Sequence, residues 1–349
     1  MKFINLPQKL KDQWYVENGR CLVSEDDLDR WVFQKACAGA SSVPAAEEIR
    51  DLYFPVLDHG FVALVDYMGG DAAIARAART SYGSGNISIR DDRHLIRYLY
   101  NHLHTSPFEM CEVKLHVKLP IFVARQWIRH RTYNVNELSG RYSIMPLQMY
   151  TPDSHVVRAQ SKSNKQGRGE EMDAKDVEAY LRSLESDRVL SSQTYVQSIR
   201  SGVARELSRI DLPLSLYTEW YCKVDLHNLM HFLALRCDSH AQWEIQQYAK
   251  LIAGMVKRIA PGALEAWIDY RFNSTRLSRL DMILLQKRLA GQEPVKEDAL
   301  ALGMTNREWD EFQSKLAYKG EAPDFTLNLE DGKSPEYFFA EGKKYVPEI

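Results

Sequence analysis

Hydrophobic and polar residues alternate most regularly over residues 112–120. The apolar positions of this segment are Val113, Leu115, Val117 and Leu119. Because successive side chains of a strand point to opposite faces, this period of two predicts a β-strand with one buried face. Residues 60–69 form an apolar run that closes on paired glycines, and they predict a second strand. Asp71 follows directly and is placed to cap a helix.

Other segments show the 3.6-residue period of an amphipathic helix. They are residues 91–104, 120–131, 173–201 and 226–259. Two further helices are expected in the tail that starts at residue 275, whereas the polar run 159–171 predicts an exposed, mobile loop. The pattern therefore predicts an α+β fold that is helix-rich with a small, mainly antiparallel sheet.

The composition of the chain argues against a nucleic-acid coat protein, a secreted protein and a membrane protein. The chain has 349 residues and a net charge of −2, which argues against a general nucleic-acid coat protein. Residues 1–14 contain no apolar signal-peptide core, and no run of eighteen apolar residues occurs, so neither secretion nor a membrane span is expected. An odd number of cysteines without C-x-x-C spacing predicts a reducing, cytoplasmic location with thiols in the core. These cysteines are Cys21, Cys37, Cys111, Cys222 and Cys237.

The first candidate site lies in residues 120–142. Arg129, His130 and Arg131 end the predicted helix together, and Glu137 is the single acid of the segment. Asn136, Ser139, Gly140 and Arg141 follow in a predicted polar loop. Backbone N–H groups and guanidinium forks in such a loop are suited to a phosphate or a planar carbonyl edge. The simpler alternative is a helix that buries Phe122, Trp127 and Ile128 and leaves its arginines in water.

The second candidate site lies in the predicted long helix. His227 and His231 are spaced i,i+4, which permits a metal site, but the glutamate of an H-E-x-x-H motif and a third ligand are missing. His231 and His240 are alternatively interior histidines with satisfied hydrogen bonds. A third interpretation is a ligand-binding wall that carries Arg236 and His240 one helical turn apart.

Several stretches resemble the flavin-dependent thymidylate synthases. They are HLHTSPFE, PIFVARQWIRHR, NELSGRY and LRCDSHAQWEIQQYA, and they occur in the order found in that family. The similarity runs over residues 57–272, the expected catalytic domain, and leaves extensions of unassigned role at residues 1–56 and 273–349. Asn134 stands where the family usually has serine, so a nucleophilic serine is not expected there.

The resemblance implies reductive methylation of dUMP to dTMP by a homotetramer whose subunits share active sites. Methylenetetrahydrofolate gives the carbon, NADPH reduces a bound FAD, and no cysteine nucleophile is used. Arg236 is implied as the catalytic residue that promotes ionisation at N3 of the pyrimidine. The implied dUMP-binding residues are Gln126, Arg129, Glu137, Ser139, Gly140, Arg141, Arg209 and Arg236. The implied FAD-binding residues are His104, Ser106, Arg129, His130, Arg131, Glu137, Asp225, His227 and His231.

Family members also carry Asn or Arg at the positions of Asp225, His227 and His231. The sequence contains no G-x-G-x-x-G motif, which is the fingerprint of a Rossmann dinucleotide site. Two other functions stay open. The first is a nucleic-acid module, and its cations and stacking rings are Arg125, Arg129, Arg131, Arg141, Trp127, Tyr133 and Tyr142. The near-neutral charge and Glu137 count against it. The second is a metal-dependent hydrolase at His227 and His231.

Overall fold

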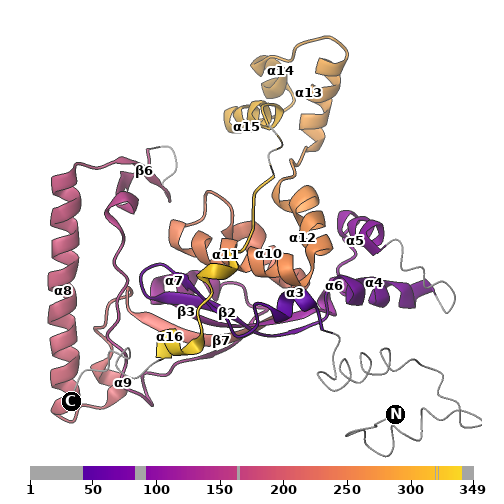
Figure 1. The fold of residues 1–349 in the computed structure, drawn as a ribbon. Helices are drawn as coiled ribbons and strands as arrows, with labels where there is room; N and C mark the ends of the chain where they lie inside the picture. Colours follow the sequence, from indigo (N-terminus) through magenta and orange to yellow (C-terminus); the bar gives the residue numbers. More distant parts are fainter. Residues whose placement is uncertain (1–41, 83–91, 163–165, 319, 321, 340–349) are drawn as a thin grey trace, which may run out of the picture.

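A five-stranded antiparallel sheet forms the centre of the computed structural model, which describes residues 42–82, 92–162, 166–318, 320 and 322–339 (Figure 1). Its order is β1-β2-β3-β7-β4. The strands are β1 Tyr53–Val56, β2 Gly60–Met68, β3 Glu112–Pro120, β4 Asn134–Glu137 and β7 Tyr217–Asp225. The predicted helix-rich α+β class is confirmed. Predictions for residues 1–41 and 340–349, including Cys21 and Cys37, lie outside the described residues.

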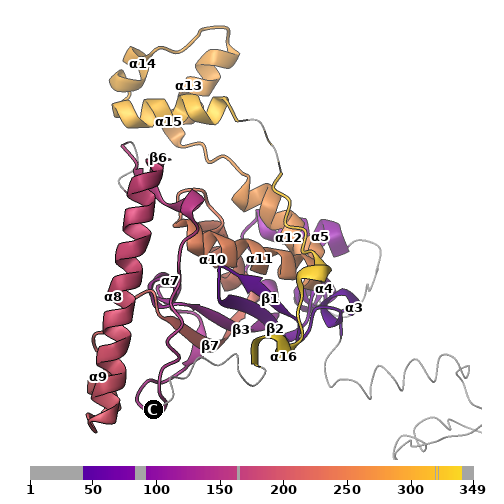
Figure 2. The same cartoon turned by 60° about the vertical axis from the view of Figure 1, so that its left-hand side comes forward.

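One face of the sheet is covered by helices, and the other is covered in part by the C-terminal segment. Val113, Leu115 and Val117 of β3 lie in the main core, as predicted, with α7 (Ile121–Trp127), α10 (Leu226–Arg236) and α11 (Trp243–Ile259) on that side. On the other face, Phe61 and His116 pack against the ring of Phe339. This phenylalanine belongs to α16 (Pro335–Phe339), which lies on the opposite side of the sheet from α10 and α11 (Figure 2).

Two predicted helices are shorter than expected. The helix expected over residues 120–131 ends at Trp127, so Arg129, His130 and Arg131 occupy the turn that follows α7. The helix expected over residues 226–259 is interrupted between α10 and α11. The Asp238 carboxylate accepts a hydrogen bond of 2.7 Å from the backbone N–H of His240. Such a local bond competes with helix formation, and it places His240 outside the helix that carries Arg236.

The polar segment 159–171 is not the loop that its composition predicts. β5 (Arg158–Gln160) and β6 (Arg168–Glu171) pair antiparallel, and the Arg168 guanidinium binds the buried carboxylate of Glu244 on α11. This contact fastens the hairpin to the body. The remaining elements before α10 are α3 Pro44–Glu47, α4 Asp71–Arg79, η1 Thr80–Tyr82, α5 Asp92–Asn101, α6 Ser106–Glu109, η3 Ser154–Val156, α8 Ala174–Arg200 and α9 Arg205–Ser208.

The C-terminal part contains more helices than the two expected. α13 (Arg279–Leu289), α14 (Lys296–Ala301) and α15 (Asn306–Leu316) surround a small core of their own. After η5 (Leu329–Asp331) the chain lies against the body, where the backbone N–H of Lys333 donates to the carbonyl of Tyr53 and that of Tyr53 to the carbonyl of Lys333. The part of the chain that follows residue 272 is therefore hydrogen-bonded to edge strand β1 of the sheet through Lys333.

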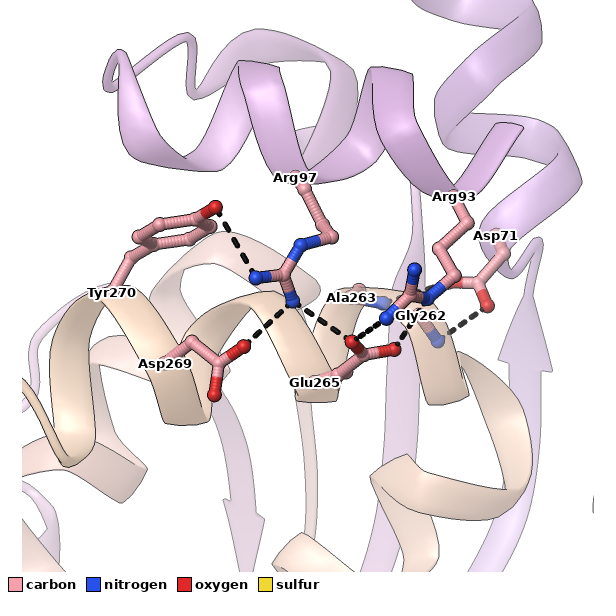
Figure 3. A network of polar contacts seen from close by, with 8 residues as sticks. All are labelled: Asp71, Arg93, Arg97, Gly262, Ala263, Glu265, Asp269 and Tyr270. Atoms are coloured by element: carbon pink, nitrogen blue, oxygen red, sulfur yellow. Dashed lines mark hydrogen bonds and ion pairs between the residues drawn. The ribbon is translucent and has the colours of Figure 1, made fainter. Parts of the chain in front are cut away.

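Asp71 caps a different helix from the one predicted. It begins α4, but its carboxylate accepts hydrogen bonds of 2.7 and 3.0 Å from the backbone N–H groups of Gly262 and Ala263 in α12 (Pro261–Trp267) (Figure 3). A carboxylate at a helix N-terminus satisfies N–H groups that have no partner within the helix. α12 continues directly into a π-helical turn, η4 (Ile268–Phe272), so Asp71 helps to position that turn.

Candidate active site

Two predicted site segments meet where α7 and α10 end. Arg236 is the last residue of α10, and its Nε–H donates a hydrogen bond of 3.1 Å to Nε2 of His130. Its Nη2 donates to the backbone carbonyl of Gln126 at 3.3 Å. Arginine offers five N–H donors, so the guanidinium keeps donors for a ligand after these two contacts.

The chemistry of this pair requires a neutral imidazole. Burial, followed by the charge of Arg236 and the neighbouring His231, lowers the pKa of His130 to about 4. A neutral ring can accept the Arg236 hydrogen bond at Nε2, whereas a protonated ring cannot. Burial also lowers the pKa of Arg236, although an arginine stays charged in proteins. The result is a half-buried cation held by an uncharged acceptor.

The shifted pKa of His130 predicts a pH dependence of stability. The folded pKa of about 4 lies below the ordinary value of 6.5, so the unfolded chain binds more protons between these values. Stability is therefore lost as pH falls through this window. In His130→Gln, whose amide oxygen can accept from Arg236, the slope of unfolding free energy against pH should be shallower by up to about 1.4 kcal/mol per pH unit.

Urea unfolding at pH 4 to 7 measures this slope for both proteins. The carboxylates titrate in both, and His231, whose pKa is also lowered by burial, is present in both. The difference between the slopes therefore isolates His130. Parallel slopes would show that His130 is protonated in the folded protein at the same pH as in the unfolded chain.

A cavity of about 210 Å³ lies beside this pair. His104, His227 and His231 line it, and they come from the chain before α6 and from the first turns of α10. The ring centroids of His231 and His130 are 6.0 Å apart, so the cavity and the Arg236 pair are adjacent. This space is smaller than the roughly 300–1,000 Å³ typical of ligand pockets, so one chain can hold only part of a large cofactor.

The other predicted nucleotide-binding residues lie at the far end of β4. The Glu137 carboxylate accepts a hydrogen bond of 2.6 Å from the Thr218 hydroxyl of β7. Arg141 lies 3.3 Å from Glu206, and its backbone N–H donates to the Ser139 hydroxyl at 3.3 Å. Asn136, expected in a loop, belongs to β4, which pairs with β7 at the edge of the sheet.

Glycine at position 140 allows this end of the site to close. A Cβ at Gly140 would lie 2.8 Å from Sδ of Met145 and 3.0 Å from Cδ of Arg209. Arg209, which ends the short helix α9, is therefore packed directly against the Ser139–Arg141 turn. The Arg209 side chain thus lies beside the turn that carries Arg141, although the two residues are far apart in the sequence, and we call them the Arg141 group.

One chain therefore presents two separate groups of predicted site residues. The four residues of β4 span about 10 Å at the usual rise of a strand, and they lie between the His130 turn and the Arg141 group. The Arg236 contacts reach Gln126 and His130 but not Arg141. Arg129 and Arg131 are exposed in the turn between the groups, and no described carboxylate pairs with either.

Two of the predicted residues have structural contacts, and a third lies outside the cavity. The side-chain amide of Gln126 donates to Gln242, whose own amide donates to Glu244 at 2.9 Å. Asp225 is the N-cap of α10 and accepts from the backbone N–H of Asn228 at 2.9 Å. Ser106 begins α6 and does not line the cavity, although its neighbour Thr105 does.

The structure also identifies cavity residues that sequence analysis missed. Tyr270, Arg271 and Arg276 line the same space as the three histidines. They follow α12, outside every stretch that showed a motif, and no spacing marks them. The alternative of interior histidines was wrong, because His231 and His240 are both exposed, although partial burial lowers the pKa of His231. Within the described ranges, no group of three or more His, Cys, Asp or Glu residues could hold a metal ion.

Known proteins with similar sequences include flavin-dependent thymidylate synthases. Residues 63–262 match the family model described as thymidylate synthase complementing protein. A flavin-dependent thymidylate synthase of Ruegeria pomeroyi is 51% identical over 266 residues, which are 75% of this chain and 87% of that protein. One of Ehrlichia ruminantium is 47% identical over 277 residues, 79% of this chain and 92% of that protein.

A solved structure shows a similar fold. The UMP/dUMP methylase PolB from Streptomyces cacaoi, bound with 5-Br UMP, has a TM-score of 0.56 and 32% identity, and the match covers 63% of this chain and 98% of PolB. None of the described helices is both long and apolar enough to cross a membrane. The matched family model and the extent of identity to these enzymes lead to one conclusion: the chain belongs to the flavin-dependent thymidylate synthase family.

Proposed function

We propose that this protein methylates dUMP reductively to dTMP, with FAD as its flavin, methylenetetrahydrofolate as carbon donor and NADPH as reductant. The observation that carries the proposal is the contact between Arg236 and His130, which joins two segments that each resemble the family. The structural neighbours are named UMP/dUMP methylases, which supports a uracil nucleotide as the substrate.

Arg236 is the proposed catalytic residue. We propose that its remaining N–H groups donate to the O2–N3 edge of a uracil ring, where negative charge develops as C5 becomes nucleophilic. His130 and the Gln126 carbonyl fix the guanidinium, so little reorganisation is needed during the reaction. Because Arg236 is half-buried, its charge is less screened than a surface charge and acts more strongly on the ring.

Arg141 and Arg209 are proposed to bind the phosphate of dUMP, with Ser139 and Gly140 beside them. Guanidinium forks bind phosphate through two parallel hydrogen bonds, which fixes the nucleotide in one orientation. In this arrangement Glu206, which lies near Arg141, competes with the ligand in the free protein. Arg129 and Glu137, one in the turn before β4 and one on it, are proposed to contact both nucleotides.

The histidine cavity fits part of a flavin dinucleotide. His104, His227 and His231 line it, and its described lining contains no carboxylate that would repel a pyrophosphate. We propose His104, Ser106, Arg129, His130, Arg131, Glu137, Asp225, His227 and His231 as the residues that hold FAD. The bound flavin supplies the hydride, and the protein holds the pyrimidine against it and excludes water.

A reaction without a cysteine nucleophile agrees with the state of the described thiols. Cys111, Cys222 and Cys237 are buried, and burial raises the pKa of each thiol to about 12. The reactive form of cysteine is the thiolate, so all three are inert near neutral pH. Their role is to fill space in the core, which is consistent with the proposed cytoplasmic location.

We further propose a homotetramer in which each active site is shared between subunits. The separation of the Arg141 group from the Arg236 pair within one chain supports this assembly. A neighbouring subunit that brings its Arg141 group to the Arg236 pair of the first would complete the site. The folate and NADPH sites are proposed at these shared sites without assigned residues.

The test is whether the purified full-length protein carries a flavin and uses dUMP. It should be yellow, NADPH should bleach its absorbance near 450 nm, and it should release tritium from C5 of labelled dUMP when methylenetetrahydrofolate is added. dUMP without folate and folate without dUMP are the controls. A colourless protein that gains no absorbance from added FAD would refute the proposal.

A further inference from the structure

The cavity beside Arg236 has a cationic wall that the assigned residues do not account for. Arg271 and Arg276 line this cavity. Within the described ranges its lining contains no acidic side chain, because its only ionisable residues are histidines, arginines and tyrosines. Arg271 is near enough to His231 to lower the pKa of that imidazole, although burial contributes more to the shift. The cavity is therefore suited to an anionic group.

The nearby carboxylates are bound to other partners. Arg93 of α5 binds Glu265 through both its Nε and Nη2 atoms, and Arg97 donates to Asp269 at 2.7 Å (Figure 3). These pairs use the acids of α12 and η4 to fasten α5 to the body. Neither Arg271 nor Arg276 forms an ion pair or donates a side-chain hydrogen bond to another residue of the described chain.

The backbone of this segment has an unusual conformation. η4 is a π-helical turn, in which the backbone N–H of Asn273 donates to the carbonyl of Ile268 at 2.8 Å. Such turns are rare and occur frequently at functional sites. Here the turn carries Tyr270 and Arg271, which both line the cavity. The segment also lies beyond residue 262, where the match to the family model ends.

We propose that Arg271 and Arg276 bind the phosphate groups of the flavin dinucleotide, an inference that rests on the proposed FAD site. Two guanidinium groups that are unpaired within the described ranges lie next to three histidines and match a pyrophosphate, which carries two negative charges and offers pairs of non-bridging oxygens to a guanidinium fork. The flavin ring and its ribityl chain are uncharged. These arginines therefore make the protein select FAD over flavins that lack a diphosphate.

Two other phosphate-bearing ligands are less suited to these arginines. The dUMP phosphate is proposed above to bind Arg141 and Arg209, at the other end of β4. NADPH carries a diphosphate too, but it must leave after each reduction, whereas a resident cofactor benefits from a half-buried cation such as Arg271. The experiment therefore measures both dinucleotides.

The test compares FAD with FMN, which lacks the AMP part and has one phosphate, and with riboflavin, which has no phosphate. Flavin is removed from the full-length protein, and FAD, FMN and riboflavin are titrated by quenching of flavin fluorescence into wild type, Arg271→Gln, Arg276→Gln and the double variant. NADPH is titrated into the same four proteins by the change in its own fluorescence. Each single variant should weaken FAD about tenfold or more, which corresponds to the loss of one charge-assisted contact. Riboflavin affinity should not change, and Arg276→Lys should restore part of the loss.

Arg279→Gln is the matched control, because Arg279 is an exposed arginine three residues further along that does not line the cavity. Equal FAD affinity in wild type and the double variant would overturn the inference and leave the proposed function intact, because wild type still binds FAD. Parallel losses for riboflavin and FAD, or a loss for NADPH alone, would also overturn it. Failure of wild type to bind any flavin would instead refute the proposed function.

Discussion

Arg236→Ala should reduce the rate of tritium release from C5 of dUMP by about 10²–10³-fold, the usual effect of removing one preorganised hydrogen-bond donor. The physical reason is the position of Arg236, which is half-buried and held by His130 and the Gln126 carbonyl. Alanine leaves the developing charge of the ring without a donor. The loss should fall mainly on kcat, because the proposed interaction strengthens as the ring acquires charge.

Two further variants make this prediction specific. Arg236→Lys keeps the charge but not the fork that reaches His130 and the ligand together, so it should recover only a small part of the activity. Arg125→Ala is the matched control, since Arg125 is an exposed arginine of α7 that has no assigned role in the enzyme. Wild-type kcat in Arg236→Ala at saturating dUMP would exclude Arg236 from the chemical step.

The binding of an oligonucleotide would depend on other residues than the binding of dUMP. In a nucleic-acid module that uses the arginines of α7 and the following turn, Arg125→Ala should weaken binding and reduce its dependence on salt. In the proposed enzyme, Arg125→Ala should change neither the affinity for dUMP nor its dependence on salt. Arg236→Ala and Arg125→Ala together therefore distinguish the proposed enzyme from the nucleic-acid-binding alternative.

The parts of the fold that sequence predicted correctly are specified locally. The alternation in β3 places Val113, Leu115 and Val117 in the core whatever strand pairs with it. β4 has only four residues, with a polar pattern, and is a strand because β7 offers it hydrogen bonds from far along the chain. Propensity and period cannot reveal such a non-local pairing. The break after α10 depends on the local bond between Asp238 and His240.

The candidate site was predictable only as a set of residue types. Resemblance pointed to His130 and Arg236, but their contact arises from the packing of α7 and α10, which the sequence does not display. Arg271 and Arg276 gave no signal, because a π-helical turn and an irregular segment bring them to the cavity. The separation of Arg141 from Arg236 follows from the extended geometry of β4, where a compact loop was expected.

The buried carboxylate of Glu244 provides the second large effect. Glu244 is 2% exposed and accepts hydrogen bonds from Tyr150 at 3.2 Å, from Gln242 and from Arg168 of β6. Glu244→Ala should lower the free energy of unfolding by about 3 kcal/mol, the lower end of the range for breaking a buried ion pair. The lower end applies because the Arg168 side chain is 31% exposed and water can solvate part of its charge.

The effect should extend to the candidate site, because Gln242 lies between Glu244 and Gln126. Urea unfolding measures the stability, and the KM for dUMP, expected to rise severalfold, measures the position of Gln126. Glu171→Ala is the matched control, since this glutamate of the same hairpin has a side chain 85% exposed and pairs with Arg158 at 3.5 Å. It should change stability by no more than about 0.5 kcal/mol. Equal stabilities of the two variants would show that the Arg168 contact contributes nothing to holding the hairpin on α11.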